Sequence, residues 1–134
     1  MFSKSTEYAL RATVFIAKGS TREKKLRLEE ITAAIDSPPS FTAKILQKLT
    51  REKIISSVPG PNGGFYLSDK AKQLPVLAVL KAMQEEETLN KCILGLKQCS
   101  EESPCPMHEQ YKSVKQKLKS LFETKTILEL AEEL

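Results

Sequence analysis

The chain has 134 residues, the length of one ordinary domain, and its 40% hydrophobic and 28% charged residues are typical of a globular protein. It contains no apolar run of about eighteen residues, which argues against a membrane span, and its N-terminal segment lacks a secretory cleavage site. Its three cysteines, an odd number, argue against a secreted disulfide framework. We therefore expect a cytoplasmic protein.

The net charge of +4 is distributed unevenly along the chain. Residues 1–72 carry thirteen Lys and Arg against seven Asp and Glu, whereas residues 73–134 carry eight against ten. A basic first part indicates a surface for nucleic acid, although solvated basic faces are common. The mildly acidic remainder indicates a separate partner or sensor region.

Apolar residues at helical spacing predict a largely buried first helix over 6–18 and a short second helix over 28–35. The segment DSPPS (36–40) predicts a turn into a helix over 40–53, because proline is tolerated in a first helical turn. The expected buried side of this helix consists of Phe41, Ile45, Leu46 and Leu49. Its opposite stripe consists of Ser40, Lys44, Gln47, Lys48 and Arg51.

The β-branched run IISSV, the tip PGPNGG and the segment FYLSD then predict a β-hairpin. Two helices and a hairpin in this order are typical of a winged helix-turn-helix, whose second helix lies in the DNA major groove. On this stripe, we expect Lys44, Lys48 and Arg51 to contact phosphates, and we expect Ser40 and Gln47 to reach base edges. The wing tip at Asn62, Gly63 and Gly64 is expected to approach the DNA backbone. The alternative is a three-helix structural core with a solvated lysine face.

Beyond the hairpin, an amphipathic helix is expected over 74–84 and another over 109–123. The second of these has a narrow apolar seam, typical of a helix that meets another helix or a partner chain. The seam consists of Tyr111, Val114, Leu118 and Leu121. Thr126 and Glu129 have capping-box spacing and predict a last short helix.

All three cysteines and the single histidine lie within KCILGLKQCSEESPCPMHE (91–109), which predicts an irregular loop. Thiolates bind soft metals and iron–sulfur clusters. However, six residues separate Cys92 from Cys99 and five separate Cys99 from Cys105, and only the two-residue interval to His108 fits common zinc spacing. From spacing alone, a metal site and an unrelated group of thiols both remain open, although charged neighbours are unusual around buried structural cysteines.

The pieces STEYALRATVFIA, LEEITAAI, FTAKILQKL and VPGPNGGFYLS resemble the IscR/NsrR/CymR-type ("Rrf-two") family of winged-helix transcription regulators, over nearly the whole chain. The resemblance implies a mainly α fold with a two-stranded wing, and a homodimer joined by the long helix 109–123 that reads a two-fold-related DNA operator. One departure is Arg27, which stands where family members often have a Ser or Thr N-cap. This departure weakens the cap by about 1 kcal/mol at most and does not threaten the fold.

In cluster-binding members of this family, three cysteines lie in the corresponding loop, and Cys92, Cys99 and Cys105 match them. The resemblance therefore implies an iron–sulfur cluster, for which we favour 2Fe-2S over 4Fe-4S. The fourth ligand in the family is either a histidine after the third cysteine, here His108, or an N-terminal acidic residue of the other subunit, here Glu7. Glu7 is also explained as a favourable acid in a first helical turn.

We accordingly expect a winged helix-turn-helix region over 1–72, a linking helix and sensor loop over 73–108, and a dimerisation helix with a short C-terminal helix over 109–134. The expected function is that of a bacterial repressor or activator that senses redox state, nitric oxide or iron status. The alternatives are a regulator of this family without a cluster, which uses a thiol switch or a small-ligand or protein-partner signal, and a protein-interaction module without a DNA role. No Ser-His-Asp set or P-loop is present, so we do not expect an enzyme.

Overall fold

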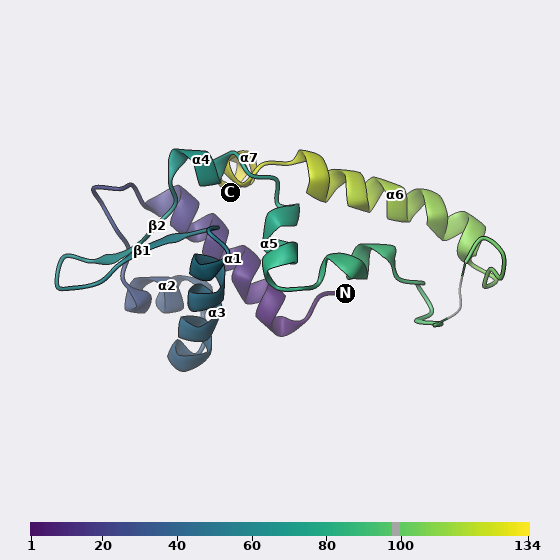
Figure 1. The fold of residues 1–134 in the computed structure, drawn as a ribbon, viewed down its shortest axis with the longest axis horizontal. Helices are drawn as coiled ribbons and strands as arrows, with labels where there is room; N and C mark the ends of the chain where they lie inside the picture. Colours follow the sequence, from purple (N-terminus) through teal and green to yellow (C-terminus); the bar gives the residue numbers. More distant parts are fainter. Residues whose placement is uncertain (98–99) are drawn as a thin grey trace.

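The computed structural model describes residues 1–97 and 100–134, and its fold is mainly helical with one antiparallel hairpin, as the sequence predicts (Figure 1). The elements in chain order are α1 (Lys4–Gly19), α2 (Leu28–Ile35), α3 (Pro39–Arg51), β1 (Ser56–Val58), β2 (Gly64–Tyr66), α4 (Asp69–Lys72), α5 (Leu77–Ala82), the 3-10 helix η1 (Glu86–Asn90), α6 (His108–Thr124) and α7 (Ile127–Glu133). In the described part of the chain, no helix has the length and hydrophobicity that crossing a membrane would need.

Helix α1 is the centre of the fold, and α2, α3, α5 and α7 all contact it. The Ser3 hydroxyl caps its start by accepting a hydrogen bond from the Thr6 amide at 3.2 Å. Ala9 and Ala12 are fully buried, and their small side chains let neighbouring helices approach closely. The helix that the sequence predicts to be largely buried therefore supports α2, α3, α5 and α7.

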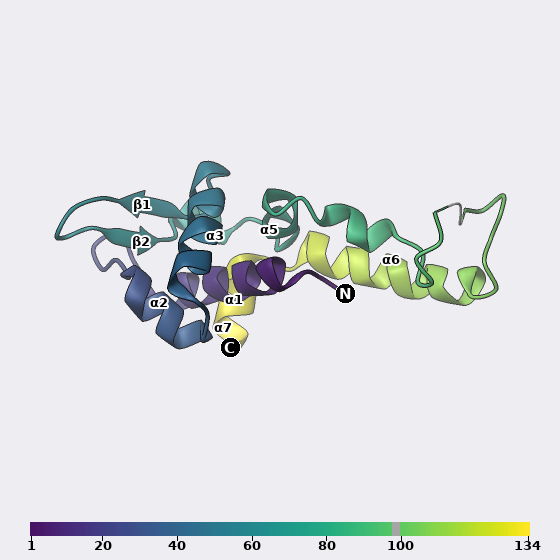
Figure 2. The ribbon, with the colours of Figure 1, turned by 90° about the horizontal axis from the view of Figure 1, so that it is seen from below.

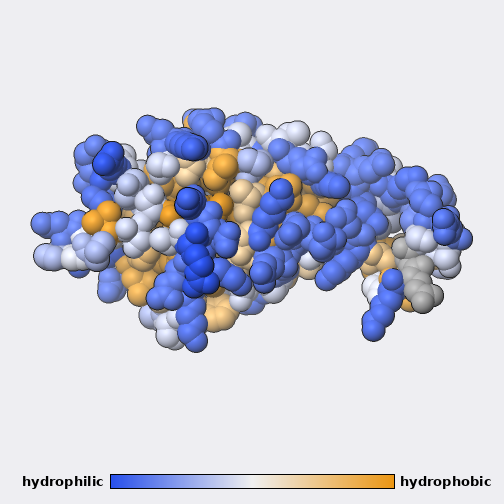
Figure 3. Space-filling model, in the orientation of Figure 1, coloured by the Kyte–Doolittle hydropathy of each residue, from blue (hydrophilic) through white to orange (hydrophobic). Residues whose placement is uncertain are grey.

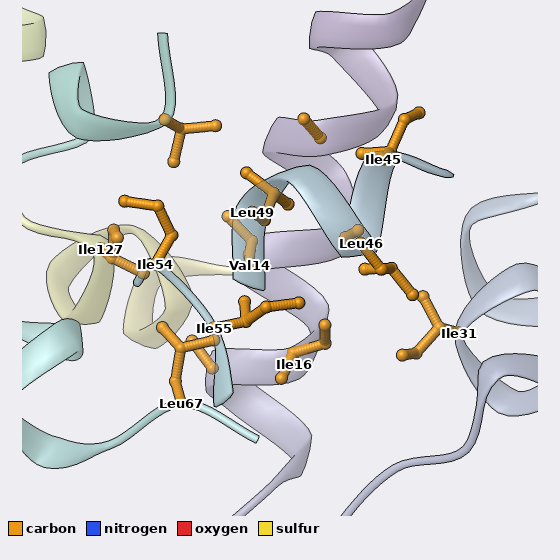
Figure 4. Close-up of a cluster of buried hydrophobic side chains, with 14 of the residues drawn as sticks. Val14, Ile16, Ile31, Ile45, Leu46, Leu49, Ile54, Ile55, Leu67 and Ile127 are labelled. Carbon is orange, nitrogen blue, oxygen red and sulfur yellow. The ribbon is translucent and has the colours of Figure 1, made fainter. Parts of the chain in front are cut away.

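Helix α3 crosses the body with Ile45, Leu46 and Leu49 buried against α1 and α2 (Figure 4). It starts at Pro39, as expected for a proline in the first helical turn. The prediction that Phe41 belongs to the buried side is wrong, because its side chain is 37% exposed. The buried side of α3 begins instead at the neighbouring Thr42, which is fully buried, and Phe41 lies beside it against the Tyr8 ring.

Strands β1 and β2 pair with Ser57 opposite Phe65, which forms the expected wing. Phe65 also exchanges backbone hydrogen bonds with Leu26, at 2.7 and 2.8 Å, so the base of the wing is tied to the segment before α2. At the turn, a β-carbon on Gly63 would lie 2.0 Å from the Val58 carbonyl oxygen. The tight wing turn thus requires glycine at this position.

The expected helix over 74–84 is shorter in the structure, where α5 covers only Leu77–Ala82. Residues 74–76 lie outside the helix, because Pro75 forms an isolated bridge with Thr126, in which Val76 donates to the Lys125 carbonyl at 2.8 Å and Ile127 donates to the Leu74 carbonyl at 2.9 Å. The short helix α4, capped by Ser68, and η1 were not predicted. The pairing brings α7 back onto α1, where Ile127 and Ala131 are buried.

Helix α6 extends away from this body, and the loop that carries the cysteines lies at its far end (Figures 1 and 2). None of its 17 residues is buried, which sets it apart from α1 and α3. On one face its surface is covered mainly by hydrophilic residues (Figure 3). The molecule therefore consists of a packed winged-helix body and a protruding helical arm.

Candidate nucleic-acid interface and cysteine loop

The polar stripe predicted for the second helix of the motif lies on the outer side of α3. Ser40, Lys44, Gln47 and Arg51 are exposed, and Lys48 is half-buried. Helix α3 contains three cations and no acidic residue, so its outer side carries positive charge without an internal counter-charge. An α-helix with this surface matches the width of the DNA major groove and the charge of its phosphates.

The wing tip lies next to the start of α2, to which Arg27 connects it. The Arg27 guanidinium donates a hydrogen bond to the Pro61 carbonyl. The backbone amide of the same residue donates to the Glu30 carboxylate at 3.2 Å, which supplies part of the missing cap. Sequence reasoning found only the departure from the N-cap pattern at Arg27, and no spacing signal indicated its contact with the wing. Asn62 at the tip is exposed, and Gly63 and Gly64 are half-buried.

Two of the three predicted thiol ligands lie close together at the far end of α6. The sulfur atoms of Cys92 and Cys105 are 3.6 Å apart, although thirteen positions separate the residues in the sequence. Cys105 is 9% exposed and Cys92 is half-buried. A disulfide would require about 2.0 Å between the sulfur atoms. Cys99 lies outside the described residues.

His108, one predicted candidate for the fourth ligand, begins α6, and its amide donates to the Cys105 carbonyl at 3.0 Å. Its Nε2 atom lies 3.7 Å from a carboxylate oxygen of Glu101, which also forms an ion pair with Lys112. The hydrogen bond and charge of Lys112, with a smaller contribution from His108, lower the pKa of Glu101 below its usual value. Glu101, His108 and Glu109 form a group whose possible ligand atoms lie within 4.8 Å of one another.

Glu7, the other candidate, is exposed in the first turn of α1. That end of the chain lies against the C-terminal part of α6, where the rings of Phe2 and Phe122 meet edge to face at 5.6 Å. The 17 residues of α6 span about 25 Å. Glu7 and the cysteine loop of the same chain therefore lie towards opposite ends of α6.

Glu85 connects the start of α1 with the segment that leads to the cysteine loop. Its carboxylate accepts hydrogen bonds from the Ser3 amide at 3.1 Å, from the Ser3 hydroxyl, and from the Thr6 hydroxyl at 2.6 Å. Partial burial raises the pKa of Glu85, but the hydrogen bonds from Ser3 and Thr6 and the charge of Lys91 outweigh it, so this pKa lies below its usual value. Sequence reasoning missed this cluster, because 79 positions separate Thr6 from Glu85.

Packed helices, a short wing and a cationic outer helix define a winged helix-turn-helix protein. The model of the Rrf2 family, described as iron-dependent transcriptional regulators, matches residues 2–133. A protein of Aquifex aeolicus named as an HTH-type transcriptional regulator is 28% identical over 132 residues, which cover 97% of this chain and 90% of that relative. IscR of Serratia proteamaculans is 25% identical over 92% of this chain and 74% of its own length.

Among solved structures, CymR, the global cysteine regulator of B. subtilis, has a TM-score of 0.77 at 15% identity, over 100% of this chain and 98% of that one. The chain belongs to the Rrf2 family, as its sequence resemblance predicts. The family consists of transcriptional regulators that bind DNA. The protein is therefore a transcriptional regulator and not an enzyme.

Proposed function

We propose that this protein is a homodimeric bacterial regulator that acts in the cytoplasm and whose DNA affinity depends on an iron–sulfur cluster held by Cys92, Cys99 and Cys105. The observation that carries this proposal is the 3.6 Å separation of the Cys92 and Cys105 sulfur atoms. The family description as iron-dependent regulators agrees with it.

The geometry of this pair fits a tetrahedral metal such as the iron of a cluster. Two thiolates bound to one tetrahedral metal at about 2.3 Å lie about 3.8 Å apart, close to the observed separation. A 2Fe-2S cluster is favoured over 4Fe-4S. Such a cluster, when bound, supplies one-electron redox chemistry and a centre at which oxygen or nitric oxide reacts. His108 is favoured as the fourth ligand, because it directly follows the turn that contains Cys105. Glu7 could serve only from a second copy of the chain.

The cysteine loop is joined directly to α6, which provides the physical route to the DNA surface. The Lys115 ammonium donates to the Asn90 carbonyl at 3.2 Å, so the residue directly before the loop is held against α6. A change of shape between Cys92 and Cys105 would be passed to the start of α6 through the His108 turn. The coupling required is modest, about 1–3 kcal/mol in typical allosteric proteins.

The dimer in this proposal is built on α6. Val114 and Leu121 are 53% and 54% exposed, although both are large apolar residues. An apolar groove of about 320 Å³, lined by Leu10, Val76, Leu121 and Leu130 among others, lies where α6 meets α1 and α7. A second α6 packed along this seam, together with the half-buried Tyr111 and Leu118, would cover these side chains and place two copies of α3 on one DNA duplex.

Within each half-site, α3 is proposed to lie in the major groove. Lys44, Lys48 and Arg51 would bind phosphates, while Ser40 and Gln47 would reach base edges. The wing tip at Asn62, Gly63 and Gly64 would approach the neighbouring sugar–phosphate backbone.

The test is anaerobic purification, followed by measurement of the visible spectrum and of iron and sulfide per chain. We expect a coloured protein that loses its iron when Cys92 or Cys105 is replaced by alanine. Ser103→Ala, in the same loop, is the matched control and should keep its iron. Colourless wild-type protein after reconstitution, with unchanged DNA binding in the cysteine variants, would refute the cluster. His108→Ala and Glu7→Gln, compared by the same spectrum, identify the fourth ligand.

A further inference from the structure

An aromatic ring is partly exposed to solvent beside the proposed base-reading residues of α3. Phe41 is the third residue of α3 and is 37% exposed, next to the exposed Ser40. Burying an aromatic side chain is strongly favourable, so an exposed one on a well-packed body leaves that free energy unused. The described part of the chain therefore leaves a good part of this apolar surface exposed.

The ring is nevertheless held in place from α1. Phe41 and Tyr8 meet edge to face, with ring centroids 5.7 Å apart and an interplanar angle of 78°. The Arg11 guanidinium and the Lys4 ammonium lie 5.0 and 5.8 Å from the centre of the Tyr8 ring. Phe41 is therefore an apolar group supported by a ring that two cations contact, on the side of the motif that is proposed to face DNA.

A ring in this place has one apolar partner on B-DNA. The N-terminal residues of a recognition helix contact base edges, and the only apolar group that a base pair presents in the major groove is the C5-methyl of thymine. We propose that Phe41 reads a thymine methyl in each half-site, and that Tyr8 is the positioning residue that holds its ring. The inference rests on the proposed role of α3 as the recognition helix.

The test uses the full-length chain, purified anaerobically, and a duplex enriched by this protein from a random DNA library. Uracil replaces each thymine in turn, which removes only the methyl group, and fluorescence anisotropy gives the dissociation constant. We expect one position per half-site at which the substitution weakens wild-type binding about fourfold, the equivalent of about 0.8 kcal/mol for one buried methyl. Substitution in both half-sites should weaken it about fifteenfold.

Phe41→Ala should weaken binding to the thymine duplex and abolish the difference between thymine and uracil at that position. Tyr8→Ala should reduce the difference, and Tyr8→Phe should preserve it, because the ring contact with Phe41 needs no hydroxyl. Leu134→Ala, which truncates another exposed apolar residue (70% exposed), is the matched control. Circular dichroism verifies that each variant is folded.

Two results would overturn the inference while leaving DNA binding intact. One is a wild-type protein that binds thymine and uracil duplexes equally at every position, and the other is a Phe41→Ala variant that still distinguishes them. A wild-type protein that enriches no duplex would overturn both this inference and the proposed function.

Discussion

Truncation of Leu121 gives the sharpest test of the arm as a dimerisation helix. Full burial of a leucine side chain contributes about 1.5–3 kcal/mol, and Leu121 is still 54% exposed in the single chain. Burial of the remaining exposed part of this side chain in a dimer would contribute about 1 kcal/mol or somewhat more to the free energy of dimerisation. A two-fold interface contains this residue twice. Leu121→Ala should therefore weaken dimerisation by about 2 kcal/mol and raise the dimer dissociation constant about thirtyfold.

Sedimentation equilibrium over a range of protein concentrations measures this constant directly. Lys119→Ala is the matched control, because it removes a long exposed side chain from the same helix outside the seam. Thermal unfolding at fixed protein concentration accounts for the groove contacts that Leu121 makes within its own chain. If Leu121→Ala dimerises as tightly as the wild type, or if both variants weaken equally, the apolar seam of α6 is not the interface.

Two further predictions concern the DNA surface and the start of α1. Arg51→Ala should weaken DNA binding by a similar factor for all DNA sequences. It should also reduce the steepness of the fall of the logarithm of the binding constant with the logarithm of salt concentration, by about one for each phosphate that Arg51 neutralises. An unchanged slope would show that Arg51 contacts no phosphate. Glu85→Gln should lower the free energy of unfolding by about 1 kcal/mol near neutral pH, because the charged carboxylate accepts the Ser3 and Thr6 hydrogen bonds at a partly exposed site. The folded-state pKa of Glu85 is lowered, so this stabilisation is present above the usual carboxyl pKa and is lost as pH falls through the folded-state value. Urea unfolding at several pH values measures it, and a difference between the two proteins that does not shrink in acid would contradict the assignment.

Local sequence patterns predicted much of the fold. The predicted bounds of α2 agree with the structure, and those of α3 and α6 agree to within two residues, because apolar spacing and the Pro39 start are properties of the chain itself. The cap formed by Thr126 was likewise predictable, since its hydroxyl accepts from the Glu129 amide at 3.1 Å, only three residues away. The late start of α5 was not predictable, because residues 74–76 pair with the segment that precedes α7.

The candidate site likewise has a part that the sequence predicts and a part that only the structure shows. The sequence by itself determined which groups are available: three cationic residues on one stripe of α3, a glycine-rich wing tip, and thiols gathered before an amphipathic helix. Only the tertiary structure decided which of them meet. It brought the Cys92 and Cys105 sulfur atoms to 3.6 Å, joined Glu85 to Ser3, and left Phe41 outside the core against Tyr8. Periodicity describes neighbours along one element, whereas these contacts depend on how α1, α3 and α6 are placed in space.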